Sequence, residues 1–116
     1  MSDRAKNDRI NNLIKLMKKD KFDALLIDST ENIFYLTGFT GTAGKFLITA
    51  DNNYFFTDGR YVEQAAAEVE NCEIIEVKDN YEDEICKILN KTEINKLHFE
   101  SKVITHHQYQ KYAQSF

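Results

Sequence analysis

The glycines of this 116-residue chain are concentrated in one segment, and that segment constrains the fold more than any other feature. All four lie between Asn32 and Gln64, at Gly38, Gly41, Gly44 and Gly59. Glycine lets the backbone adopt a positive φ and lets other groups approach closely, but it weakens the interior of a helix or strand. The segment therefore predicts a short helical turn, a glycine-rich loop, a β-hairpin and the start of a second helix.

The hairpin is predicted from two apolar runs that flank a polar turn. The strands are expected at Lys45–Thr49 and Tyr54–Thr57, with residues 50–53 as the turn. A helix is expected to begin near Arg60, because an apolar stripe at helical spacing follows it, formed by Val62, Ala65, Ala66 and Val69.

The rest of the chain alternates between helical and extended patterns. An amphipathic helix is expected from about Ser2 to Lys19, and apolar runs predict strands at Asp23–Asp28, Cys72–Val77 and Leu97–Glu100. Side chains that can cap a helix mark three further helix starts: Ser29 or Thr30, Asp79 with Glu82, and Thr105 with Gln108.

This order of elements predicts an α/β fold, a three-layer α/β/α sandwich. Its mixed sheet should contain about five strands, including the one β-hairpin. The length of 116 residues is that of one domain, residues 1–116. The last predicted helix runs to Phe116 without a stop signal, so we expect this domain to be part of a longer protein.

Composition excludes several classes of function. The net charge of −4 argues against nucleic-acid binding, for which a basic face is the usual requirement. No apolar run has the length of a membrane span, and the N-terminus lacks the apolar core of a signal peptide. With Cys72 and Cys86 expected as reduced thiols, the sequence predicts a cytoplasmic protein. A membrane-binding or partner-binding role for the basic N-terminal helix is the less favoured alternative to packing on the core.

No complete catalytic site is visible in the residues. Gly44-Lys45 is followed by Phe46 and a strand, so the pattern is not a phosphate-binding loop. The histidines, at positions 98, 106 and 107, lack the spacing of zinc ligands, and Thr42 fits a nucleophile elbow only loosely. We therefore assign no catalytic residue and no metal ligand within this chain.

Arg60 and the aromatic residues around the loop each leave two interpretations open. An arginine in the first turn of a helix opposes the helix dipole, so Arg60 should either pair with Asp58 or Glu63 or point toward a ligand or partner chain. The aromatic side chains are either core residues or an exposed lip that marks a binding surface; they are Phe34, Tyr35 and Phe39.

Two motifs resemble a known family. The run N-I-F-Y-L-T-G-F-T-G-T-A-G, a hydrophobic strand, and then T-D-G-R-Y-x-x-Q-A resemble the N-terminal domain of the creatinase/prolidase/Xaa-Pro aminopeptidase family, most closely its bacterial Xaa-Pro peptidases. The leading helix, the D-A-L-L-I strand and the segment F-E-S at residues 99–101 extend the resemblance over nearly the whole chain.

The resemblance implies a two-domain hydrolase that cleaves the bond before proline in peptides. Its C-terminal "pita-bread" domain would hold two divalent metal ions, of the Mn or Co type, on two Asp, one His and two Glu, and would activate a bridging water. The resemblance places none of those ligands in the present residues. The fragment 1–116 alone is therefore expected to be inactive.

For the N-terminal domain, the resemblance implies a role in forming a homodimer and in lining a substrate pocket. Phe34 corresponds to an aromatic that helps to wall the pocket of the neighbouring subunit, and Thr40 lies in the loop that covers it. The matching motifs add Phe39, Arg60 and Tyr61 as candidate pocket-lining residues. Charged residues of the prolidase and creatinase loops have no counterpart here, where threonine and glycine stand instead.

Two other functions compete with the peptidase hypothesis. Pseudo-peptidase relatives, including a histone chaperone subunit, keep this fold for protein binding, so the chain could belong to a protein-interaction module. A flavodoxin-like domain that binds a small molecule is supported only by the order of the layers.

Overall fold

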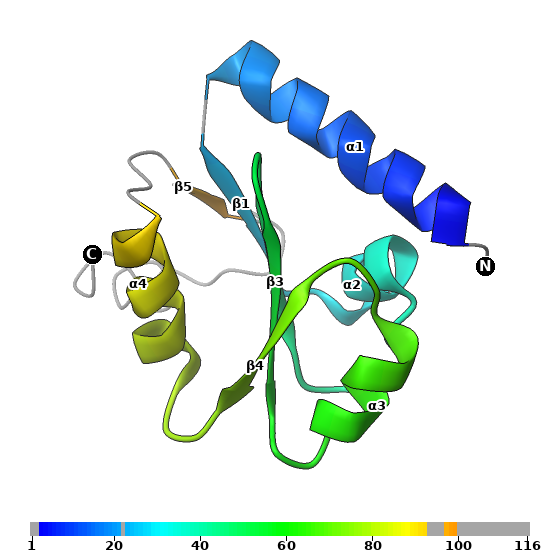
Figure 1. Ribbon diagram of the computed structural model, residues 1–116, viewed down its shortest axis with the longest axis vertical. Helices are drawn as coiled ribbons and strands as arrows, with labels where there is room; N and C mark the ends of the chain where they lie inside the picture. The colour runs from blue at the N-terminus through cyan, green and yellow to red at the C-terminus, as the bar shows by residue number, and fades with distance from the viewer. Residues whose placement is uncertain (1–2, 22, 93–96, 100–116) are drawn as a thin grey trace.

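The structure is a computed structural model that describes residues 3–21, 23–92 and 97–99 (Figure 1). Within these residues the elements follow the order α1 (Asp3–Asp20), β1 (Ala24–Ile27), α2 (Thr30–Thr37), β2 (Lys45–Thr49), β3 (Asn53–Asp58), α3 (Val62–Glu68), β4 (Glu73–Val77), α4 (Tyr81–Lys91) and β5 (Leu97–Phe99). The last predicted helix, marked by Thr105 and Gln108, lies outside the described residues.

The strands form one mixed sheet in the order β4-β3-β2-β1-β5. Strands β1, β2 and β3 pair antiparallel, while β4 runs parallel to β3 and β5 parallel to β1. Helices α1, α2 and α3 cover one face of the sheet and α4 covers the other (Figure 1). The predicted α/β/α sandwich with a hairpin is therefore confirmed.

The alternation of side chains along the strands divides the core into two parts. Phe46, Ile48 and Phe55 face α1, α2 and α3, whereas Leu47 and Phe56 face α4. Because β2 and β3 are buried on both faces, they read as almost continuous apolar runs in the sequence. Each fully buried side chain of this size stabilises the fold by about 1.5–3 kcal/mol through the hydrophobic effect.

Helix α2 is short and is capped at both ends. The Ser29 hydroxyl accepts the N–H of Asn32 at 3.2 Å, which shows that Ser29 rather than Thr30 is the N-cap. Gly38 closes the helix with a φ of +82°, a conformation that glycine adopts without strain. Its N–H donates to the carbonyl of Phe34 at 2.8 Å.

Two predicted helix starts are corrected by the structure. Helix α3 begins at Val62 instead of Arg60, because Asp58 accepts the N–H of Arg60 at 2.9 Å through its carboxylate and that of Tyr61 at 3.0 Å through its carbonyl. Arg60 therefore lies in a turn before the helix, where its guanidinium is paired with Asp58.

The second correction concerns α4. Its N-cap is Asn80 rather than Asp79, and the Asn80 side-chain oxygen accepts the N–H of Asp83 at 2.9 Å. The capping pair therefore lies one residue later than the sequence pattern placed it.

Candidate functional site

Two motifs that are separate in the sequence meet at one end of the sheet. The glycine loop, residues 38–44, leads from α2 into β2, and the DGRY turn, residues 58–61, leads from β3 into α3. Strands β2 and β3 are antiparallel neighbours with Lys45 opposite Phe56, so the start of β2 lies beside the end of β3. The hairpin register thus brings the loop and the turn together next to α3.

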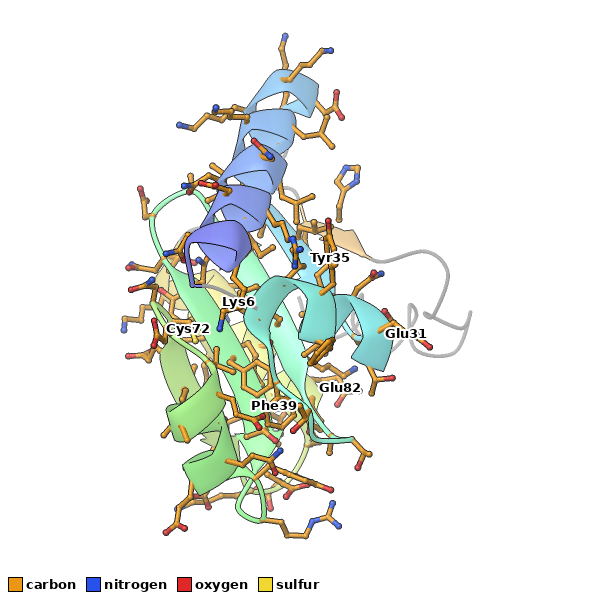
Figure 2. All side chains as sticks on the ribbon, turned by 90° about the vertical axis from the view of Figure 1, so that its right-hand side faces the viewer. Lys6, Glu31, Tyr35, Phe39, Cys72 and Glu82 are labelled. Carbon is orange, nitrogen blue, oxygen red and sulfur yellow. The ribbon has the colours of Figure 1, made fainter. Side chains whose placement is uncertain are left out.

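Phe39 forms the base of the glycine loop. Its side chain is only 2% exposed and lies between α2 and α3 (Figure 2). The ring packs on Phe55 at a centroid distance of 4.7 Å and meets Tyr61 edge-on at 6.0 Å. The side chain of Phe39 therefore lies in the domain's own core, beneath the loop. The predicted pocket-lining role of Phe39 stays a prediction.

The loop lies directly on these rings at Gly41. A Cβ atom at this position would overlap the Phe39 ring and would lie 2.9 Å from Cδ1 of Tyr61. Only glycine therefore lets the backbone cross here without moving the rings.

A polar cluster from α3 binds the next residue of the loop. The Glu68 carboxylate accepts the backbone N–H of Thr40 at 2.8 Å and its hydroxyl at 2.9 Å. The Gln64 amide donates to Thr40 Oγ1 at 2.8 Å and to Glu68 Oε1 at 3.2 Å. These hydrogen bonds, led by the Thr40 N–H, lower the pKa of Glu68, and the positive charge of Lys6 adds to the effect.

Further bonds fix the loop on either side of Thr40. The hydroxyls of Thr42 and Tyr61 lie 2.9 Å apart and share a hydrogen bond. Thr57 donates its hydroxyl to the Ala43 carbonyl at 2.5 Å, and Phe39 donates its N–H to Thr37 Oγ1 at 3.1 Å. The loop is therefore held along its length, while the side chains of Thr40 and Thr42 stay exposed.

Arg60 is paired and yet accessible. Its guanidinium binds both oxygens of Asp58, with Nε–Oδ1 at 3.1 Å and Nη2–Oδ2 at 2.9 Å. The Arg60 side chain is nevertheless 75% exposed. Through this hydrogen bond Arg60 lowers the pKa of Asp58, and the carboxylate in turn raises the pKa of the guanidinium. The predicted ion pair with Asp58 is confirmed, and contact of Arg60 with a ligand or partner stays a prediction.

The exposed face of α2 carries two aromatic side chains. Phe34 is 46% exposed and Tyr35 is 51% exposed, whereas Ile33 and Leu36 face the core. Arg9 from α1 stacks on the Tyr35 ring at 3.9 Å and donates to the Tyr35 carbonyl at 2.8 Å, so Tyr35 lies beside α1 (Figure 2). A groove of about 510 Å³ separates α1 and α2 at this point. Phe34 and Tyr35 are therefore exposed and Phe39 is in the core, while a binding role for the exposed pair stays a prediction.

The described residues contain no group of three or more His, Cys, Asp or Glu side chains that could hold a metal ion. His106 and His107 lie outside them. Cys72 and Cys86 are not joined in a disulfide, and burial raises the pKa of Cys72 to about 11, which keeps it protonated and a poor nucleophile at neutral pH. Within the same part of the chain, no helix has the length and apolarity needed to cross a membrane.

Sequence reasoning missed Gln64 and Glu68 as residues of this site. They lie four positions apart on α3, so their side chains share one face of the helix. A polar pair at that spacing directly after the DGRY turn was the available signal. The contact of these two residues with Thr40 could not be predicted from the sequence, because it depends on how β2 and β3 pair.

Comparison with known proteins places these features in a family. The profile of the Creatinase/Prolidase N-terminal domain matches residues 9–116. An uncharacterized peptidase of Bacillus subtilis, YqhT, is 35% identical over 105 residues, which are 90% of this chain and 30% of that protein.

Solved structures agree with this match. A Xaa-Pro dipeptidase from Bacillus anthracis superposes with a TM-score of 0.91 at 31% identity, over 96% of this chain and 31% of its own. The N-terminal domain of the cytoplasmic peptidase PepQ from Mycobacterium tuberculosis superposes with a TM-score of 0.84 at 30% identity, over 93% of this chain and 84% of its own.

The mixed sheet and the joined loop and turn thus define a domain of the Xaa-Pro peptidase class. The chain belongs to the creatinase/prolidase family, as its N-terminal domain, which confirms the resemblance seen in the sequence. Its homologues include Xaa-Pro aminopeptidases, which are hydrolases. The chain spans about 30% of the length of the Bacillus subtilis relative.

Proposed function

We propose that residues 1–116 are the non-catalytic N-terminal domain of a metallopeptidase that cleaves X-Pro bonds. The family membership and the description of a homologue as an Xaa-Pro aminopeptidase support this assignment. The catalytic domain would follow in the longer protein, since relatives are about three times as long as the matched region. By analogy with the Mycobacterium tuberculosis relative, which is described as cytoplasmic, we place the protein in the cytoplasm.

The domain's own contribution would be to form the dimer and to line the substrate pocket of the partner subunit. The observation that carries this proposal is the glycine loop, which is fixed to its own domain while Thr40 and Thr42 remain exposed. A surface that is already ordered loses little conformational entropy when it binds, which suits a pocket wall. Phe34, Arg60 and Tyr61 would complete the wall, and proline-containing peptides would be its ligands.

The metal ions of this proposal do not belong to the described residues, whose acidic and histidine side chains do not converge on a cation site. Two divalent ions would be held by the catalytic domain, where they would lower the pKa of a water molecule. For the residues described, we therefore derive only binding and positioning roles.

The test is to assay the full-length protein on X-Pro dipeptides and on longer peptides with proline in the second position. We expect cleavage that requires Mn²⁺ or Co²⁺ and that a chelator abolishes, while the 116-residue chain alone cleaves neither substrate. Absence of metal-dependent cleavage by the full-length protein would refute the proposal. Downstream sequence without the five metal ligands would instead favour the protein-interaction module.

A further inference from the structure

We propose that Gln64 and Glu68 of α3 are positioning residues of the peptidase, which hold Thr40 of the glycine loop in the one conformation that meets the peptide substrate. This inference rests on the proposed function, because it assigns the means by which the loop keeps its shape. Neither residue belongs to the group that we predicted to line the pocket.

The three side chains form a closed set of hydrogen bonds. Glu68 binds Thr40 twice, through the backbone N–H at 2.8 Å and the hydroxyl at 2.9 Å. The Gln64 amide bridges Thr40 and Glu68: its Nε2 donates to Thr40 Oγ1 at 2.8 Å and to Glu68 Oε1 at 3.2 Å. Because one carboxylate binds both the main chain and the side chain of Thr40, the cluster fixes the φ and χ1 angles of that residue together.

The cluster also determines what Thr40 can offer to a ligand. A threonine hydroxyl has one proton to donate and two lone pairs to accept with. The proton is used on the Glu68 carboxylate, and one lone pair is used by the Gln64 amide. The exposed Thr40 is left with a methyl group and one lone pair, so it presents an apolar, accepting surface. The methyl group suits the apolar ring of proline, whereas the lone pair needs a donor from elsewhere in the substrate, because a proline nitrogen in a peptide bond carries no hydrogen.

The loop needs this external support because of its composition. Three of the four glycines of the chain lie at residues 38–44, and glycine loses more conformational freedom on ordering than any other residue. The loop lies outside regular secondary structure, so ladder hydrogen bonds do not order it. Its order comes from Phe39 below it, from α3 beside Thr40, and from the bonds of Thr42 to Tyr61 and of Ala43 to Thr57.

The cluster lies at the surface, which separates its effect from the stability of the domain. Thr40 is exposed and Glu68 is half-buried, and hydrogen-bonded ionic groups near the surface add little to global stability. Removing Glu68 should therefore loosen the loop without unfolding the protein. The loss should fall on substrate binding, which is a change that a merely structural role would not produce.

The test uses Glu68→Ala, the conservative Glu68→Gln, and Glu63→Ala as the matched control, since Glu63 is an exposed glutamate of the same helix. The first measurement is amide hydrogen exchange at Thr40 in the 116-residue chain, with a thermal melt to verify that each variant is folded. The loss of a hydrogen bond to a carboxylate should speed exchange at Thr40 by about tenfold or more in Glu68→Ala. Glu68→Gln should show a smaller change, and Glu63→Ala none.

The second measurement is the kinetics of X-Pro cleavage by the full-length protein. We expect Glu68→Ala to raise KM by about three- to tenfold with kcat within about twofold of wild type, which is the pattern of lost substrate binding. Glu68→Gln, which keeps a side-chain oxygen that can accept, should raise KM less than Glu68→Ala does.

The two measurements separate the possible failures. Unchanged Thr40 exchange in Glu68→Ala would overturn the positioning role whatever the activity. Faster exchange with an unchanged KM would show that the cluster orders the loop but does not affect substrate binding. That result would also overturn the positioning role. A wild-type protein without X-Pro cleavage would refute the proposed function, and the positioning role with it, while the exchange data would still establish the cluster.

Discussion

At the scale of the residue, two phenylalanines of one motif have opposite environments. Phe34 exposes 46% of its side chain on α2, whereas Phe39 exposes 2% and packs on Phe55 and Tyr61. The aromatic character of both is plain in the sequence, but the direction of each ring is set by the helix that carries Phe34 and by the turn at Gly38 that follows it. The two residues should therefore respond differently to the same substitution.

Replacing Phe39 with alanine in the 116-residue chain is expected to lower the free energy of unfolding by about 3–5 kcal/mol, because the ring fills the core beneath the loop. Phe34→Ala is the matched control and should stay within about 0.5 kcal/mol of wild type. Denaturant unfolding followed by circular dichroism measures both. Equal losses for the two variants would contradict the assignment of Phe39 to the core.

At the scale of the element, helix α2 depends on its ends. Helices shorter than about 12–15 residues are marginal on their own. With 8 residues, α2 relies on the Ser29 cap, the Gly38 cap and the burial of Ile33 and Leu36. Helix α3 differs, since its N-cap Tyr61 makes no side-chain capping bond and its start is set by the turn at Asp58.

Ser29→Ala should destabilise the chain by about 0.5–2 kcal/mol, because the N–H of Asn32 loses its acceptor. Thr30→Ala serves as the control: Thr30 is exposed and lies one residue inside the helix, so its effect should be under about 0.5 kcal/mol. Thermal unfolding of the two variants distinguishes them. A larger loss for Thr30→Ala would mean that the helix starts elsewhere.

At the scale of the whole molecule, the site lies at one end of the sheet, where Tyr81 of α4 also lies, with its ring centroid 5.4 Å from Lys45 Nζ. The glycine loop and α3 lie on the face covered by α1, α2 and α3, while α4 packs on the opposite face (Figure 1). In the proposed function, this loop-bearing face would meet the catalytic centre of a second domain or subunit.

Mixed dimers of the full-length protein test whether Phe34 acts in trans. In the first, the subunit with an intact catalytic domain carries Phe34→Ala and its partner has an inactivated catalytic domain with Phe34 retained. In the second, Phe34→Ala lies on the inactivated partner. A pocket wall in trans predicts a normal KM for the first dimer and a raised KM for the second, because only there does the active centre face alanine. The reverse pattern would show that Phe34 acts within its own subunit.

Features that depend on neighbours in the chain were predictable from the sequence alone. The periodicity of Ile10, Leu13 and Met17 and the strands around the polar turn are local signals, and the structure contains α1 and the hairpin where these signals placed them. The sequence offered Ser29 or Thr30 as the cap of α2, and the structure selects Ser29. The family motif was also recognisable in the sequence, because it consists of contiguous residues. The start of α3 was missed, since the Asp58 side chain that sets it competes with the helical pattern.

Contacts between residues of distant segments became visible only in the folded domain. The register of β2 on β3 places Thr40 beside Glu68 and Thr42 beside Tyr61, across 28 and 19 positions of the chain. It also assigned Phe39 to the interior and Phe34 to the surface. The physical reason is that capping and periodicity act over one or two turns, whereas burial and long-range hydrogen bonds depend on the packing of the whole sheet.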